Sequence, residues 1–422
     1  MSEKTAKRAL LLATFAFAAN FSVWTLYAVL VIPVTTQWEL DTLEVAALLS
    51  APMLTGALSR IPAGIAADQG SPKKLFVIQM LICLPPLTLL YLADTYMTLL
   101  LIGLWLGLSG SSFTLGIRYV NDFFPRDQQG TAMGVFGVGN AGAAITLVLA
   151  PFLMQSIGWH YVGLVYAGGL MFVALAFWFF APQRPARENR PDPFNEPWYT
   201  LLKQTRIWRL GLYYYFVFGS FLALLLWLPY YYTEAYQLSL SQAMAFTLFF
   251  VATSSVVRAL GGWFADKYGG RSVNWSVFWV CLGCLFFLSY PPTTMTIHGV
   301  EQDVHIQIAI DVWFFSVLLF VIGIAQGFGR ASVFKVIHEH YPNNMGRVGG
   351  IVAAIGALGG FTLPVLFAAA VEVLGFYSAS FMLLYGVLAV CMMAMYFAIR
   401  AERYSRRLKE AASYNFLEDD DL

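Results

Sequence analysis

The chain has 422 residues, of which 59% are hydrophobic and only 12% are charged, and its mean hydropathy is +0.66. About a quarter of the residues of a soluble protein are charged, because its surface must be wetted, so soluble enzymes, nucleic-acid binders and disordered proteins are excluded. The net charge of +1 indicates no polyanionic partner such as nucleic acid. The composition predicts a protein that crosses the lipid bilayer several times.

Apolar segments predict twelve membrane-spanning helices, because a helix needs about 20 residues to cross the hydrocarbon of a bilayer. In chain order the predicted spans are roughly 9–33, 45–66, 75–93, 97–120, 132–154, 160–181, 209–232, 241–262, 274–290, 310–336, 348–370 and 378–400. The fold class is therefore an all-α membrane protein. Its predicted parts are an N-terminal six-helix bundle (1–181), a cytoplasmic linker (182–208), a C-terminal six-helix bundle (209–400) and a cytoplasmic tail (401–422).

The distribution of Lys and Arg orients these spans, since basic residues collect in cytoplasmic loops. With the N-terminus in the cytoplasm, all but five of the 25 Lys and Arg lie in loops or termini on the cytoplasmic side. The predicted outer loops contain none. Both termini are therefore expected in the cytoplasm, and no cleavable signal peptide is expected.

The two predicted bundles repeat each other in sequence. Arg60, Gly64 and Asp68 recur 198 residues later as Arg258, Gly262 and Asp266. A second register, with an offset of 217 residues, pairs Arg118 with Lys335, Pro125 with Pro342, Gly139 with Gly356 and Gly142 with Gly359. Parallel six-helix repeats of this kind predict a secondary transporter whose site lies between the halves, near the middle of the membrane.

Five basic residues lie inside the predicted spans, namely Arg60, Arg118, Arg258, Arg330 and Lys335, and no Asp or Glu lies well inside any span. An isolated Arg or Lys at the bilayer centre costs at least about 2.5–3.5 kcal/mol. The uncompensated positive charge therefore predicts an anionic substrate. Arg60 and Arg258 each lie eight residues before the loop Asp, about 12 Å deep, and are the predicted substrate-binding pair.

The sequence assigns no single role to the other three basic residues. Arg118 and Lys335 are shallower, and two interpretations stay open: ion pairs of a gate, or guidance of the anion. The repeat places Phe113 opposite Arg330, so symmetry predicts no role for Arg330.

The segments Gly64–Lys74 (GIAADQGSPKK) and Gly261–Arg271 (GGWFADKYGGR) resemble the loop motif of the major facilitator superfamily. The resemblance covers essentially the whole chain and implies that fold. It also implies that Asp68 and Asp266 pair with basic residues at a cytoplasmic gate. The first copy departs from the motif, with Pro72-Lys73-Lys74 where an arginine is usual.

Two segments of small residues, Gly134–Pro151 and Gly349–Pro364, allow close helix packing. Together with GALSRIPAG around Arg60, FFPRDQQGTAMG and GGFTLP, they resemble the signature segments of the nitrate/nitrite porter family. Their signature glycines are Gly137, Gly139, Gly142, Gly356, Gly359 and Gly360. The resemblance implies a planar anion between Arg60 and Arg258, with Asn140 donating to it and with aromatic rings around it at Phe113, Tyr214 and Phe218.

The expected function is transport of nitrate, nitrite or both by alternating access, with nitrate/nitrite exchange favoured over nitrate/proton symport. Alternatives are a porter for formate, oxalate or cyanate, and an anion sensor that does not transport. No catalytic, metal-ligand or phosphate-binding motif is present in the sequence, so neither enzyme activity nor a cofactor is expected. A monomer is expected, because one chain carries both halves of the site. The resemblance to the superfamily, together with the expected lack of a signal peptide, implies a bacterial inner membrane.

Overall fold

The computed structural model describes residues 3–183, 198–298, 303–342 and 344–418. Within these residues, twelve helices are long and apolar enough to cross a membrane. Each overlaps one predicted span, which confirms the twelve-helix fold. The proposed boundaries of the two halves stay predictions, and most of the predicted linker, 184–197, lies outside the described residues.

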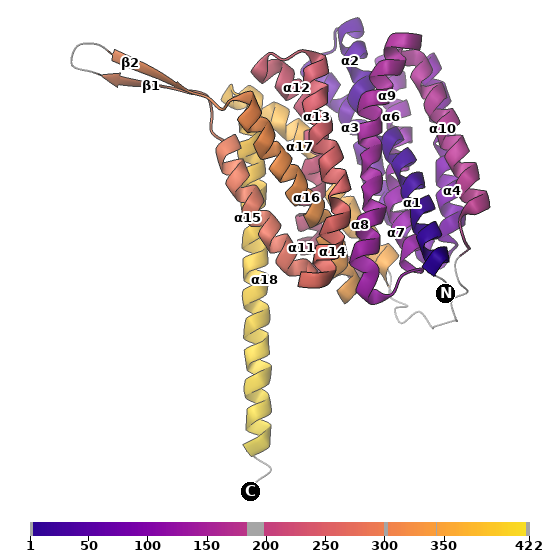
Figure 1. The fold of residues 1–422 in the computed structure, drawn as a ribbon, viewed down its shortest axis with the longest axis vertical. Coiled ribbons are helices and arrows are strands. Elements are labelled where there is room, and N and C mark those ends of the chain that lie inside the picture. The colour runs from indigo at the N-terminus through magenta and orange to yellow at the C-terminus, as the bar shows by residue number, and fades with distance from the viewer. Residues whose placement is uncertain (1–2, 184–197, 299–302, 343, 419–422) are drawn as a thin grey trace.

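The first six spans are built from ten α-helices with four short 3₁₀ turns between them (Figure 1). The helices are α1 (Glu3–Trp24), α2 (Tyr27–Trp38), α3 (Thr42–Gln69), α4 (Pro72–Ile82), α5 (Leu84–Leu89), α6 (Tyr96–Leu106), α7 (Ser112–Asn121), α8 (Gln129–Gly137), α9 (Gly142–Ile157) and α10 (Trp159–Phe180). The 3₁₀ turns are η1 (Leu90–Leu92), η2 (Gly107–Ser111), η3 (Arg126–Gln128) and η4 (Val138–Ala141).

The second six spans follow the 3₁₀ turn η5 (Trp198–Lys203). They comprise α11 (Thr205–Tyr214), the π-helical turn η6 (Tyr215–Gly219), α12 (Ser220–Tyr236), α13 (Leu240–Val256), α14 (Arg258–Tyr268), α15 (Gly270–Leu288), α16 (Val312–His340), α17 (Met345–Leu374) and α18 (Ala379–Glu418). Across the interface between the halves, α3 packs against α17 and α8 packs against α14.

Two features lie outside the helical bundles (Figure 1). The strands β1 (Thr293–His298) and β2 (Asp303–Ile308) form an antiparallel hairpin between α15 and α16, so the all-α prediction missed one small element. At the opposite end of the molecule, α18 continues beyond the bundle to Glu418. The predicted tail is therefore helical for most of its length. We call the end that carries the β-hairpin the hairpin end. The opposite end, where α1 begins and α18 extends beyond the bundle, is called the basic end.

Several spans are broken near their middle, where regular α-helix gives way to another backbone form. The turn η2 interrupts the span of α6 and α7, and η4 interrupts that of α8 and α9. The π turn η6 lies between α11 and α12, and a break at Val257 separates α13 from α14. Irregular backbone inside a membrane is tolerated where it is buried in protein or lines a site. We therefore expect the functional site to lie at these breaks.

Candidate functional site

The six residues that the sequence singles out for substrate binding come together at these breaks. Phe113 follows η2, and Asn140 lies within η4. Tyr214 comes directly before the π turn, Phe218 lies within it, and Arg258 is the first residue of α14. Arg60 lies in α3, two residues before the helix-internal Pro62. All six side chains are buried. The structure therefore brings together the six residues that the sequence singled out, and their role in binding the anion stays a prediction.

Arg60 is held by backbone carbonyls from both halves. Its Nε donates to the Gly110 carbonyl at 3.0 Å and its Nη1 donates to the Ala353 carbonyl at 2.9 Å. Its Nη2 is buried and has no hydrogen-bond acceptor among the described residues. Because a buried donor without an acceptor is costly, this N–H group is suited to an incoming anion.

Arg258 is held by Asn140, which belongs to the other half. The Asn140 carboxamide lies with its oxygen toward the guanidinium groups, since the reverse orientation would oppose donor to donor. In this orientation the oxygen accepts from Arg258 Nη1 at 3.0 Å. The Nε of Arg258 is buried without an acceptor in the described part of the chain. Each arginine of the pair thus has one unsatisfied donor.

Aromatic rings surround the two guanidinium groups. The Arg60 Cζ atom lies 4.9 Å from the ring centroid of Trp24, 5.0 Å from that of Phe218 and 5.4 Å from that of Phe113. The Arg258 Cζ atom lies 5.0 Å from the same Phe113 centroid. Cation–π attraction favours guanidinium groups at such distances, so one ring contacts both members of the pair.

The predicted aromatic residues also stack on one another. The rings of Phe113 and Tyr214 are 6.3 Å apart with 14° between their planes, and those of Phe113 and Phe218 are 6.3 Å apart with 15°. Flat faces that are nearly parallel suit a flat ligand. Sequence analysis did not identify Trp24, whose only signal was its place in the first span.

Arg330, for which symmetry predicted no role, lies beside this cluster. Its Nη1 donates to the Asn140 oxygen at 2.7 Å. Its Nη2 donates to both the carbonyl and the hydroxyl of Ser254, at 2.5 and 2.6 Å, and its Nε donates to the Gln326 carbonyl at 3.3 Å. No carboxylate of the described residues pairs with Arg60, Arg258 or Arg330, so three buried positive charges share one region.

Arg118 and Lys335 do pair with carboxylates, near the basic end. Arg118 Nε donates to Asp68 at 2.7 Å and its Nη1 to Asp122 at 2.7 Å. Asp68 also accepts the backbone N–H of Arg347 at 2.8 Å, near the start of α17 in the other half. We call these residues the first cluster. Arg118 thus forms ion pairs with two carboxylates; both interpretations of its role, gate ion pair or guidance of the anion, stay predictions.

The second cluster is the counterpart of the first by sequence repeat. Lys335 Nζ lies 2.8 Å from Asp266. Asp266 also accepts the backbone N–H groups of Gly130 and Thr131 at 3.0 and 2.7 Å, and the Thr131 hydroxyl at 2.8 Å. Gly130 and Thr131 lie at the start of α8, in the first half. Each repeat therefore closes the basic end by placing a carboxylate on the N-terminus of a helix from the other half, where the helix dipole favours it.

Glycines bring the backbones of the two halves into contact at this end. A Cβ atom at Gly64 would lie 2.3 Å from the Gly346 carbonyl oxygen, and one at Gly262 would lie 2.2 Å from that of Gly130. No side chain fits between them.

The signature glycines are arranged differently. Gly137 faces the Arg258 guanidinium of the other half. The remaining five pack within their own half against Phe17 (Gly139), Ala18 (Gly142), Tyr214 (Gly356), Gly219 (Gly359) and Leu222 (Gly360). The glycines at the interface of the halves are thus mainly those nearer the basic end.

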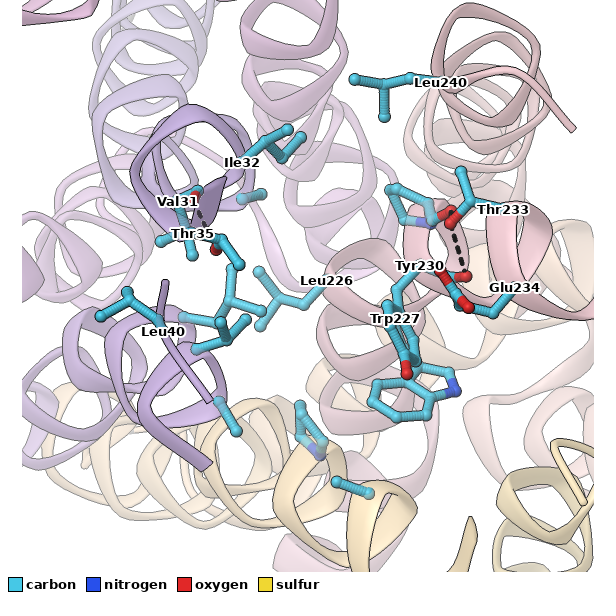
Figure 2. A pocket seen from close by; sticks show the side chains of 17 residues that line it. Val31, Ile32, Thr35, Leu40, Leu226, Trp227, Tyr230, Thr233, Glu234 and Leu240 are labelled. Carbon is cyan, nitrogen blue, oxygen red and sulfur yellow. Dashed lines mark hydrogen bonds between the residues drawn. The ribbon is translucent and has the colours of Figure 1, made fainter. Parts of the chain in front are cut away.

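A cavity of about 360 Å³ opens between the halves at the hairpin end (Figure 2). Residues of α2 and α3 line one side, and residues of α12, α13 and α17 line the other. The lining is mostly apolar, and Glu234 is its only charged residue among those described. The basic end is closed by the two clusters, so the molecule is closed at one end and hollowed at the other.

Comparisons with known proteins agree with this architecture. Residues 10–300 match the family model of the Major Facilitator Superfamily. The fold also resembles the crystal structure of the human organic anion transporter MFSD10 (TETRAN), with a TM-score of 0.71 and 13% identity over 92% of this chain and 99% of that one. It resembles an inward-facing, occupied bacterial homolog of the human lysosomal transporter Spinster as well, with a TM-score of 0.66 and 16% identity over 95% and 98% of the two chains. The protein is therefore a transporter of the Major Facilitator Superfamily.

Curated relatives narrow the assignment. The probable nitrate/nitrite antiporter NarK1 of Thermus thermophilus is 33% identical over 405 residues, covering 93% of this chain and 91% of that protein. The nitrite extrusion protein of Bacillus subtilis (strain 168) is 27% identical over 399 residues, covering 94% and 96%. The chain belongs to the nitrate/nitrite porter family of the major facilitator superfamily.

Proposed function

We propose that this protein exchanges nitrate for nitrite across the bacterial inner membrane by alternating access. The observation that supports this most directly is the pair of unsatisfied donors, Arg60 Nη2 and Arg258 Nε, beside a shared aromatic ring. The names of the relatives supply the identity of the anion.

The geometry favours a small planar oxyanion over a bulky one. A guanidinium group is flat, always charged and forked, so it matches the oxygens of nitrate or nitrite. The nearly parallel rings of Phe113, Tyr214 and Phe218 favour a flat ligand between or beside them. The NH₂ group of Asn140 can donate to an oxygen of the anion without adding charge.

Exchange follows from the charge of the empty site. Arg60, Arg258 and Arg330 repel one another when no anion is bound, so reorientation of the empty protein is disfavoured. A bound anion screens this repulsion and allows the halves to rock around it. Each half-cycle then needs an anion, which is the condition for obligatory exchange. Glu234, in the cavity at the hairpin end, is the one carboxylate in that path among the described residues.

We place the basic end in the cytoplasm, following the distribution of Lys and Arg. The first and second clusters then form the cytoplasmic gate, and the cavity at the hairpin end faces the periplasm. A single chain carries both halves of the site, so the transporting unit is a monomer.

Transport by purified protein in liposomes tests this proposal. Vesicles are loaded with nitrite, nitrate is added outside, and nitrate uptake is followed with and without a pH gradient. We expect uptake that needs internal nitrite and ignores the gradient. Arg60→Lys keeps the charge but loses the fork, and should lower exchange at least about tenfold. Arg271→Lys is the matched control, since Arg271 pairs with Glu402 on the surface, and should exchange normally.

Other outcomes would change the assignment. Uptake into empty vesicles that is driven by the pH gradient would mean nitrate/proton symport, and would direct attention to Lys335 and His338 at the basic end. Absence of nitrate and nitrite flux, with flux of formate, oxalate or cyanate, would mean a porter for another anion. Anion binding without any flux would indicate a sensor.

A further inference from the structure

All three nitrogens of the Arg330 guanidinium group are bonded to neutral oxygens. The acceptors are the Asn140 amide, the carbonyl and hydroxyl of Ser254, and the Gln326 carbonyl. The face of the group lies 4.0 Å from the ring centroid of Phe221. Four of the five N–H groups of Arg330 are therefore engaged, and a single one, on Nη1, is left. A buried charge is costly in a membrane. Arg330 must therefore lie beside the site chiefly for a reason other than direct binding of the anion.

We infer that Arg330 is a positioning residue of the anion site, acting through Asn140; the inference rests on the proposed function. The Asn140 oxygen accepts from Arg330 Nη1 at 2.7 Å and from Arg258 Nη1 at 3.0 Å. With its oxygen held by two cations, Asn140 has only its NH₂ group to offer an anion. Arg330 thus makes Asn140 a donor and keeps it from turning its oxygen toward the substrate.

The other contacts of Arg330 reach the backbone breaks on which the site is built. Ser254 lies one helical turn before Arg258. The Gln326 amide donates to the Ser220 hydroxyl at 2.7 Å, and that hydroxyl donates to the Phe216 carbonyl inside the π turn. π turns occur frequently at functional sites. Arg330 therefore connects the helix start that carries Arg258 to the turn that carries Phe218.

The bond between Arg330 and Asn140 also crosses the interface of the two halves, since α16 belongs to the second half and η4 to the first. Arg258 makes the same crossing to the same oxygen. One amide oxygen is thus the meeting point of two cations from the opposite half. This arrangement ties η4 of the first half to α14 and α16 of the second half beside Arg258.

A double-mutant cycle separates this role from a simple effect of charge. Nitrate KM and Vmax are measured in nitrite-loaded liposomes for wild type, Arg330→Lys, Asn140→Ala and the double variant. Lysine keeps the charge, but one ammonium group cannot span the four acceptors. We expect Arg330→Lys to raise KM about tenfold, and the double variant to lie within about twofold of Asn140→Ala, because residues that act through each other are not additive. A wild-type KM in Arg330→Lys, or multiplicative effects in the double variant, would overturn the inference.

Two adjacent serines provide a matched control that leaves every arginine in place. The Ser254 hydroxyl accepts from Arg330, whereas the Ser255 hydroxyl donates to the Val251 carbonyl at 2.7 Å. Ser254→Ala should raise KM by roughly threefold, the loss of one hydrogen bond, and Ser255→Ala should leave it unchanged. Equal KM values in the two variants would also contradict the inference. This pair carries the test if Arg330→Lys is not monodisperse on size exclusion.

The outcomes distinguish the two claims. A wild-type protein without nitrate flux refutes the proposed function and the inference together. Wild-type flux with variants at Arg330 and Ser254 that keep the wild-type KM refutes the inference alone.

Discussion

The first and second clusters at the basic end both join the two halves of the molecule, but they do so through different interactions. In the first, Asp68 accepts one backbone N–H, while Arg118 spans Asp68 and Asp122. In the second, Asp266 accepts two backbone N–H groups and a hydroxyl, and Lys335 supplies the charge. The repeat preserves the position of the carboxylate and of the helix N-terminus that it meets.

The difference shows where each cluster concentrates its interactions. The first depends on a rigid guanidinium fork that holds two carboxylates within its own half. The second depends on the helix N-terminus of the other half, with three donors aimed at one carboxylate. We therefore expect the second cluster to contribute more of the closure between the halves.

Substituting the interface glycines should have the largest effect and should not distinguish the clusters. Gly64→Val and Gly262→Val place a side chain where a Cβ alone would lie 2.3 and 2.2 Å from a carbonyl oxygen. Overpacking costs about 1–3 kcal/mol or more, so exchange should fall roughly 10- to 100-fold in both. Gly283→Val in α15 is the control, since that glycine faces open space. Normal exchange by either interface variant would show that the basic end need not close this tightly.

Removing each carboxylate charge should separate the clusters. Asp266→Asn should open the basic end more than Asp68→Asn, because Asp266 receives more donors and because Arg118 keeps Asp122 when Asp68 is neutralised. Hydrogen bonds to charged groups are worth about 1.5–3 kcal/mol each, so a difference of roughly tenfold is expected. The measurement is the rate of maleimide labelling of Thr114→Cys, a buried position against Gly64 and Gly350. Equal labelling rates would mean that the clusters contribute equally.

Replacing the Arg of the first cluster by Lys, and the Lys of the second by Arg, should change the labelling rates less than removing the carboxylate charges does. Arg118→Lys leaves one ammonium group where two carboxylates were bridged, so labelling at Thr114→Cys should rise by about fivefold. Lys335→Arg keeps a cation beside Asp266 and should change labelling by less than about twofold. A larger effect of Lys335→Arg than of Arg118→Lys would mean that the second cluster depends on its basic residue more than the first cluster does.

Among the substitutions that should raise labelling at least twofold, the smallest effect is expected from Thr131→Val. The sequence repeat places Val348 opposite Thr131, so this substitution gives the second cluster the chemistry of the first. The hydroxyl bond to Asp266 is lost, but both N–H bonds and Lys335 still satisfy the carboxylate. The net cost should therefore be only about 0.5 kcal/mol, at the low end of the range for a hydrogen bond. Labelling at Thr114→Cys should rise by two- to threefold. The reciprocal Val348→Thr should lower it, and no change in both would mean that the hydroxyl plays no part in closure.

Sequence reasoning anticipated the features that depend on composition and spacing. The twelve spans follow from hydrophobic runs long enough to cross a bilayer. The cluster of Arg60, Arg258, Asn140 and the aromatic residues follows from charge without compensation and from resemblance to a family. The two carboxylates at the basic end follow from the internal repeat, which also relates Arg118 to Lys335.

Other features depend on tertiary packing and carry no local signal. The breaks at η2, η4 and η6 lie in the segments GLSGS, VGNA and YFVFG. Small and aromatic residues of this kind are equally common in regular membrane helices, so composition does not distinguish 3₁₀ or π backbone from α-helix. Trp24 joins the site only because the first span passes beside Arg60. Arg330 breaks the internal symmetry, and its partners Ser254 and Asn140 come from helices far away in sequence, so no spacing could reveal them.

The backbone contacts at the basic end have a thermodynamic consequence. Where glycine meets a carbonyl across the interface, no side chain is present to lose rotamer freedom when the halves meet. A seal of long side chains would give up about 0.5–2 kcal/mol of conformational entropy per residue at each closure. The glycine contacts at Gly64 and Gly262 avoid that loss, so this end can close and reopen in every transport cycle with little entropy change at the glycine contacts themselves.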